Sequence, residues 1–154
     1  MSQVHDSAFE SIRYEYDSVV SGLGLLSKSS AKGIPGNPAY SRDQVEAAIA
    51  TSGDAYALLL VATAEGFLRD FLESQGIAIG DEPKLSSLVD QTTKQFCVGL
   101  VSSQKRAQRK AIGVGEMHSL RTNRNDYAHG HGRNLFPTVP RVQAILSRFC
   151  RPIP

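Results

Sequence analysis

The segment from Ser41 to Gln75 constrains the fold most, because it predicts one long helix with two apolar sides. Ser41 precedes Arg42-Asp43-Gln44, the order of a capping box, and Gly76 follows as a stop signal. A helix that is apolar on two sides has to be covered on both, so it is expected at the centre of a bundle. One stripe holds Val45, Ile49, Tyr56, Leu59, Leu60, Thr63 and Phe67, and the other holds Leu58, Val61, Leu68 and Leu72.

Helical periodicity also marks the segments on either side, whereas alternating strand patterns are scarce. Pro83 is expected to open the third helix, and Gly130 to end the fourth. The predicted fold is an all-α, up-and-down four-helix bundle with a short additional C-terminal helix. The helices are expected over about 6–26, 41–75, 84–104, 114–128 and 139–149, with a loop over 29–40 and a basic connector over 105–110.

Length and composition indicate a single globular domain over residues 1–154, with 41% hydrophobic and 21% charged residues. No uninterrupted apolar run approaches the roughly 18–20 residues that cross a bilayer, so no membrane partner is expected. The first twenty residues include four carboxylates, which argues against a signal peptide. Cys97 and Cys150 make no disulfide framework, so we expect two buried thiols in a reduced, cytoplasmic protein.

Charge is distributed unevenly along the chain. Residues 1–100 hold 7 Lys and Arg against 13 Asp and Glu, whereas residues 101–154 hold 10 against 2. A basic third of this kind suggests a polyanion partner such as RNA, although it could equally be a solvated face or meet the acidic half of the same fold. The candidate RNA-binding residues are Lys105, Arg106, Arg109, Lys110 and Arg133.

The run Arg124-Asn125-Asp126-Tyr127-Ala128-His129-Gly130 lies in the basic third, at the end of a predicted helix. A guanidinium holds a phosphate with several fixed donors, and an imidazole moves protons near neutral pH. Together they can cleave a phosphodiester without a metal when the substrate supplies its own nucleophile, as RNA does through its 2′-hydroxyl. Arg124, Asn125 and His129 are therefore the candidate catalytic residues.

Helical geometry raises a difficulty for this pair. His118, Arg121, Asn125 and His129 fall on one stripe of the fourth helix, whereas Arg124 and His129 point about 140° apart. The arginine could wrap around, the helix could loosen before Gly130, or the partners could come from two chains of a two-fold dimer. A competing interpretation is that His129 merely caps the helix.

Glu65 is unusual because it lies on an apolar stripe, where a carboxylate needs a partner. Arg124, at the edge of the core face, is the expected partner, and Arg121 is the other candidate. Glu65 would then orient the arginine, or form a purely structural ion pair. Tyr127 is expected to face the core with Met117 and Leu120, which would make it a supporting residue beside the site.

Two stretches resemble the HEPN superfamily, with Ala62–Leu72 the more generic and Leu120–Gly130 the more specific. Arg124, Asn125 and His129 fill the places where family members carry Arg, a polar residue and His. The chain looks closest to the bacterial RiboL-PSP-HEPN branch, and the similarity covers most of it. A regulatory tyrosine that follows the His in one toxin subgroup has no counterpart, since Gly130-His131-Gly132 follows His129.

The resemblance implies a metal-independent endoribonuclease that needs no cofactor, of the toxin or antiphage type. It also implies a homodimer with the Arg/His motifs at the interface, and an antitoxin or operon partner protein. The alternative is a non-catalytic helical module that binds RNA, nucleotide or protein, as some members do. A metal site built from His118, His129 and His131 is a weaker idea, because their spacing matches no usual zinc pattern.

Overall fold

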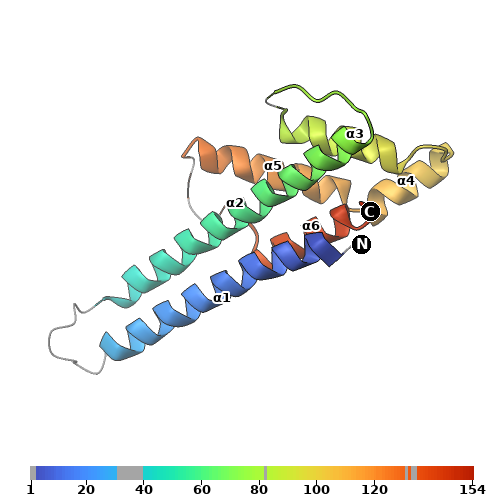
Figure 1. Cartoon of the computed structure of the whole chain (residues 1–154). Coiled ribbons are helices and arrows are strands. Elements are labelled where there is room, and N and C mark those ends of the chain that lie inside the picture. The colour runs from blue at the N-terminus through green and yellow to red at the C-terminus, as the bar shows by residue number, and fades with distance from the viewer. Residues whose placement is uncertain (1–2, 31–39, 82, 131, 133–134) are drawn as a thin grey trace.

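The computed structural model describes residues 3–30, 40–81, 83–130, 132 and 135–154, and within these it is entirely helical apart from turns and connecting segments (Figure 1). This confirms the predicted all-α bundle with a short C-terminal helix. The six helices are α1 (Gln3–Ser30), α2 (Arg42–Ser74), α3 (Leu85–Phe96), α4 (Ser102–Ala111), α5 (Val114–Ala128) and α6 (Val139–Cys150).

The α2 helix lies at the centre of the bundle, as its two apolar stripes predict. It contacts α1 and α6 on one side and α3 and α5 on the other, and it forms a long hairpin with α1 (Figure 1). Its N-terminus carries the predicted capping box. The Gln44 backbone N–H donates to Ser41 Oγ at 3.2 Å, and the Ser41 N–H donates to Gln44 Oε1 at 2.8 Å.

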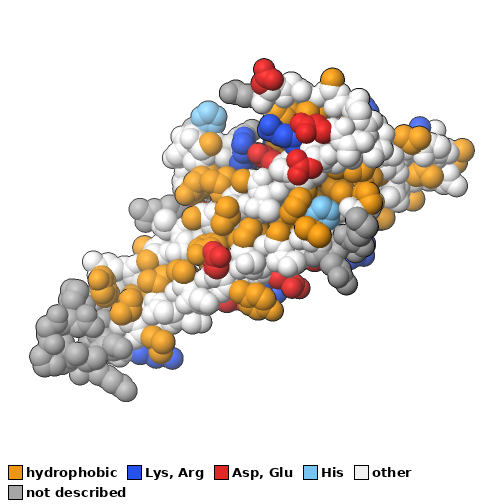
Figure 2. All heavy atoms as spheres, viewed as in Figure 1, with side chains coloured by type: hydrophobic (Ala, Val, Ile, Leu, Met, Phe, Trp, Pro, Cys, Tyr) orange, Lys and Arg blue, Asp and Glu red, His pale blue; other side chains and the backbone are white. Residues whose placement is uncertain are grey.

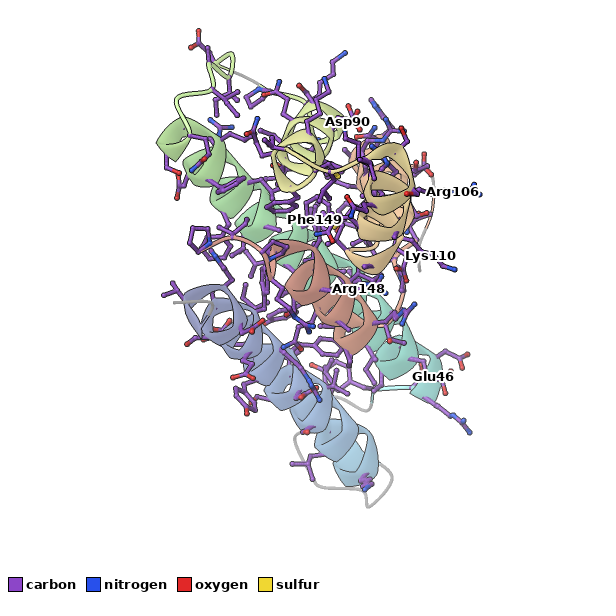
Figure 3. The ribbon with its side chains drawn as sticks, turned by 90° about the vertical axis from the view of Figure 1, so that its right-hand side faces the viewer. Glu46, Asp90, Arg106, Lys110, Arg148 and Phe149 are labelled. Carbon is purple, nitrogen blue, oxygen red and sulfur yellow. The ribbon has the colours of Figure 1, made fainter. Side chains whose placement is uncertain are left out.

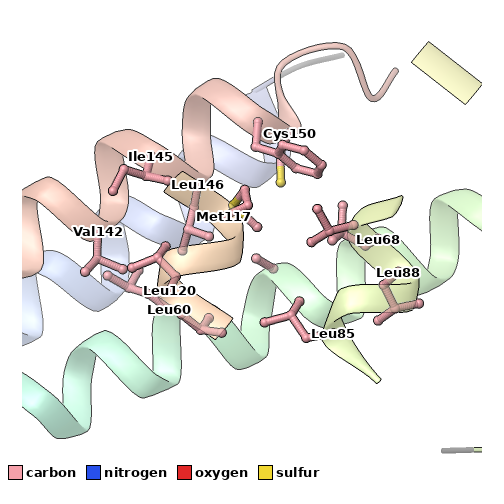
Figure 4. Packing of buried hydrophobic residues seen from close by; sticks show 14 of the residues in the cluster. Leu60, Leu68, Leu85, Leu88, Met117, Leu120, Val142, Ile145, Leu146 and Cys150 are labelled. Atoms are coloured by element: carbon pink, nitrogen blue, oxygen red, sulfur yellow. The ribbon is translucent and has the colours of Figure 1, made fainter. Parts of the chain in front are cut away.

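One hydrophobic cluster joins five of the six helices (Figure 4). Leu68 of α2, Met117 of α5 and Phe149 of α6 are fully buried within it. Both thiols, Cys97 and Cys150, are buried and unpaired, as expected, and burial raises the pKa of the Cys150 thiol to about 12. The packing therefore fixes α5, which carries the candidate site, against α2 and α6.

The predicted third helix is too long, and the predicted basic connector is itself helical. The chain leaves α3 at Cys97 and passes Gly99 with φ +75°, a left-handed conformation that suits glycine. It then starts α4, where the Val101 N–H donates to Gln104 Oε1 at 3.1 Å. No α4 residue is buried, so this helix has no apolar stripe by which the sequence could reveal it.

By length and hydropathy, α2 is also the one helix among the described residues that could cross a membrane. The most apolar 18-residue window of this helix has a mean hydropathy of 1.4. The central helix of a soluble bundle has the same property, and α2 packs against four other helices. Its hydropathy is therefore weak evidence for a membrane location.

The junction between α5 and α6 depends on Gly113, which precedes α5 with φ +77°. A Cβ atom at this position would overlap the Arg148 guanidinium. That guanidinium pairs with Glu116, which also accepts a hydrogen bond from Arg141 Nη2 at 2.6 Å. Glycine thus permits both the left-handed turn and the close approach of α6.

Gly113→Ala should lower the free energy of unfolding by about 1–3 kcal/mol, because alanine is strained at positive φ and displaces Arg148 from Glu116. Thermal melts should show a decrease in Tm of about 3–10 °C. Gly115→Ala is the matched control, since a Cβ there meets open space within α5. Equal melting temperatures for the two variants would contradict this account.

Candidate functional site

The candidate catalytic residues lie on the C-terminal half of α5, and the inner face of this helix is packed as predicted. Met117 and Leu120 are buried in the core. Tyr127 is half-buried and its ring packs near Phe136, with the ring centroids 6.3 Å apart. These contacts hold α5 in place, and on the opposite side Asn125 and His129 near its C-terminus are exposed.

Arg124 pairs with Glu65, as the sequence predicts, across the contact between α5 and α2. Arg124 Nε lies 3.3 Å from Glu65 Oε1, and the side chains are 40% and 21% exposed, respectively. The other candidate partner, Arg121, is partly buried and forms no described ion pair with Glu65. The Arg124 guanidinium is thus tethered at one edge while part of it remains accessible.

The environment of Glu65 disfavours its charged form. Burial raises the pKa of this carboxyl above its ordinary value, and the positive charges of Arg124 and then Arg69 oppose that rise without cancelling it. Figure 2 shows acidic and basic side chains together on the visible face, near where α3 and α5 approach the C-terminal half of α2. The ionised form of Glu65 is therefore less favoured in the folded chain than in the unfolded one, and its nearest basic partner is Arg124.

Glu65→Gln should be as stable as the parent near pH 4 and more stable at pH 7. Because the pKa is raised in the folded state, stability is lost as the pH rises through the folded pKa, and glutamine does not undergo this loss. Melts at both pH values measure the difference, with Glu73→Gln on the exposed surface of α2 as the control. A variant that is less stable at pH 7 would show that Glu65 is a structural partner instead.

His129 lies at the C-cap of α5, where its backbone N–H donates to the Asn125 carbonyl at 3.0 Å. The helix stays regular to Ala128, and Gly130 ends it with φ +71°, so it does not loosen before that glycine. His129 and Asn125 are both exposed. Within one chain, Arg124 and His129 therefore stay on different faces.

The predicted RNA-binding residues of α4 are all exposed. They form two pairs, and the two members of each pair lie one helical turn apart. Lys105 and Arg109 line a cavity of about 280 Å³ at the C-terminal end of α3, together with Lys94. Arg106 and Lys110 project from α4 in the view of Figure 3. Lys94 was missed by sequence reasoning because it lies outside the basic third of the chain. Arg133 and His131 lie outside the described residues.

Part of the basic third is neutralised within the fold. Glu116 pairs with both Arg141 and Arg148, which joins α5 to α6. Those two arginines therefore have an ionic partner within the fold, and among the described residues four exposed cations without a described carboxylate partner lie on α4.

Sequence reasoning also missed a contact between α5 and α3. His118 Nε2 lies 3.4 Å from Asp90 Oδ1, and both side chains are accessible. Three or more metal-ligating side chains do not gather anywhere in the described part of the chain. His118 and His129 lie about 16 Å apart along one helix, too far to share a metal ion.

The two ends of the candidate site thus have different partners, with Arg124 paired to Glu65 of α2 and His118 to Asp90 of α3.

No family model, no curated protein and no solved structure matches this chain.

Proposed function

We propose that this protein is a metal-independent endoribonuclease of the toxin or antiphage type, and that Arg124, Asn125 and His129 form its active site. The observation that carries the proposal is the Arg124–Glu65 pair. A half-buried carboxylate pairs with a guanidinium on the same helix that carries an exposed Asn and an exposed His. The resemblance to HEPN proteins, which rests on these same residues, supports this assignment.

In the proposed reaction, His129 accepts the proton of a 2′-hydroxyl, whose oxygen attacks the adjacent phosphorus. Arg124 stabilises the negative charge that develops on the phosphorane oxygens, and Asn125 positions the phosphate. The bond from phosphorus to the 5′-oxygen then breaks, and that oxygen receives a proton from a second His129 or from water. The products are a 2′,3′-cyclic phosphate and a 5′-hydroxyl.

The proposed site is completed by a second copy of the chain. Because Arg124 and His129 lie on different faces of α5, a two-fold dimer would let the arginine of one copy meet the histidine of the other. An exposed apolar strip of α2 beside Glu65 suits such contact, since Leu59 is 45% exposed and Ala62 and Gly66 are also exposed. The cations of α4 would bind the RNA backbone at a distance from the chemistry.

The direct test is incubation of the pure protein with end-labelled RNA in EDTA. We expect cleavage that EDTA does not inhibit, with cyclic phosphate ends that acid converts to 2′- and 3′-monophosphates. If the protein cuts no RNA, or cuts only with a divalent metal, the proposal is wrong.

A second candidate function is that of a binding module without catalysis, and one observation favours it. In the single chain Arg124 is already paired with Glu65 and does not share a face with His129. Under this alternative the protein binds RNA without cutting it. Substitutions on α4 would then flatten the salt dependence of binding, and His129→Ala would have little effect.

A further inference from the structure

We propose that His118, oriented by Asp90, is the general acid of this ribonuclease and protonates the leaving 5′-oxygen. The inference rests on the proposed function and assigns the proton donor, which the reaction above leaves to a second His129 or to water. His118 lies on α5 and Asp90 on α3, so the pair is formed by the packing of the two helices.

The contact with Asp90 determines which nitrogen of the imidazole would react. The Asp90 carboxylate lies 3.4 Å from Nε2, an ion-pair distance when the ring is protonated, so Nδ1 is the nitrogen that faces away from this partner and can exchange a proton with a substrate. The His118 side chain is 32% exposed, so its ring is partly enclosed and still within reach of a substrate. His118 thus has a carboxylate partner on one side of its ring and access to solvent.

Arg121 places a cation beside this histidine. It follows His118 by three residues, and the two share one side of α5. The Nε–H group of Arg121 is buried and donates to no acceptor among the described residues. A buried charged donor of this kind is costly unless an acceptor is supplied, and a phosphate oxygen would be a strong one. The His118–Arg121 pair therefore has the chemistry to bind and protonate a phosphodiester.

His118 and His129 lie on the same side of α5, and their spacing along this helix shows how the two could work together. Within one chain the two residues lie about 16 Å apart along the helix axis, which is too far for one phosphate. If two α5 helices pack antiparallel about the midpoint between residues 123 and 124, His118 of one copy lies opposite His129 of the partner subunit. Arg124 of each copy then lies near the centre of the contact, about 8–9 Å along the axis from these histidines. The acid and the base would then come from different copies of the chain.

Each histidine exchanges one proton with the RNA in the proposed step. His129 takes the proton from the 2′-hydroxyl as the new bond from oxygen to phosphorus forms. His118, in its imidazolium form, gives its Nδ1 proton to the 5′-oxygen as the bond from phosphorus to that oxygen breaks. The net change is one proton moved from the 2′-oxygen to the 5′-oxygen, and solvent restores both histidines.

The test compares ordinary RNA with RNA in which sulfur replaces the bridging 5′-oxygen, because a thiolate leaves without being protonated. We expect His118→Ala to slow cleavage of ordinary RNA by about 10²–10⁴-fold. The same variant should cut the sulfur substrate within a few-fold of the parent rate. His129→Ala, the matched control, should be slow on both substrates because it lacks the base.

Asp90→Asn should show the same selectivity with a smaller loss, since Asp90 positions His118 without touching the RNA. Circular dichroism and thermal melts establish that each variant is folded. The proposal is overturned if His118→Ala cuts ordinary RNA at the parent rate, or if it slows both substrates equally. If the parent protein cuts neither substrate, the ribonuclease function itself has failed, which is a separate result.

Discussion

His129→Ala should reduce RNA cleavage by about 10²–10⁴-fold while leaving the fold intact, because a positioned general base contributes a factor of this size. The side chain is exposed at the C-cap of α5, and its backbone hydrogen bond to Asn125 is kept by alanine. Single-turnover cleavage of end-labelled RNA in EDTA measures the chemical step directly.

Thr122→Ala is the matched control for this substitution. Thr122 is exposed on the same helix, and its hydroxyl donates only to the His118 carbonyl one turn earlier. We expect the control to retain the parent rate and both variants to bind RNA. If His129→Ala cleaves RNA at the parent rate, His129 is not the general base and the proposed mechanism is wrong.

Arg124→Ala should reduce cleavage by about 10²–10³-fold, because it removes a donor aimed at charge that develops in the transition state. Arg124→Lys should recover only part of the activity, since an ammonium keeps the charge but loses the planar fork of donors. Arg124→Ala also leaves Glu65 with Arg69 as its remaining basic neighbour, so we expect the melting temperature to fall below that of the parent by more at pH 7 than at pH 4.

Arg106→Ala on α4 is the control that separates the loss of cleavage expected for Arg124→Ala from a simple loss of positive charge. Its side chain is exposed and lies on a helix with no buried residue. We expect weaker RNA binding, a flatter salt dependence and an unchanged rate at saturating protein. If Arg106→Ala and Arg124→Ala reduce the rate of cleavage of bound RNA equally, Arg124 has no special role in the chemical step.

The central helix and the Arg124–Glu65 pair could be predicted from sequence because both leave a local signal. The two apolar stripes of α2 require neighbours on two sides, and a carboxylate on an apolar stripe requires a cation. The apolar stripes of α2 do not reveal how completely neighbouring helices cover each residue, because that depends on the assembled bundle. Leu59 lies on one of these stripes and is still 45% exposed.

The α4 helix and the His118–Asp90 pair could not be predicted for two different physical reasons. The α4 helix is solvated on all sides, so it lacks the apolar periodicity that identifies the other helices. His118 and Asp90 lie on separate helices, and their contact depends on how α3 is aligned against α5. That alignment is set by packing of the core and cannot be read from either segment alone.

The central claim is that Arg124 and His129 of two copies form one ribonuclease site, and mixing two inactive variants tests it most directly. Arg124→Ala and His129→Ala proteins, unfolded together in equal amounts and refolded, should recover about a quarter of the parent activity. Half of the dimers are then mixed, and each mixed dimer holds one intact site of two. If both variants are folded and dimeric, and their mixture stays as inactive as either one alone, the two residues do not act across the interface.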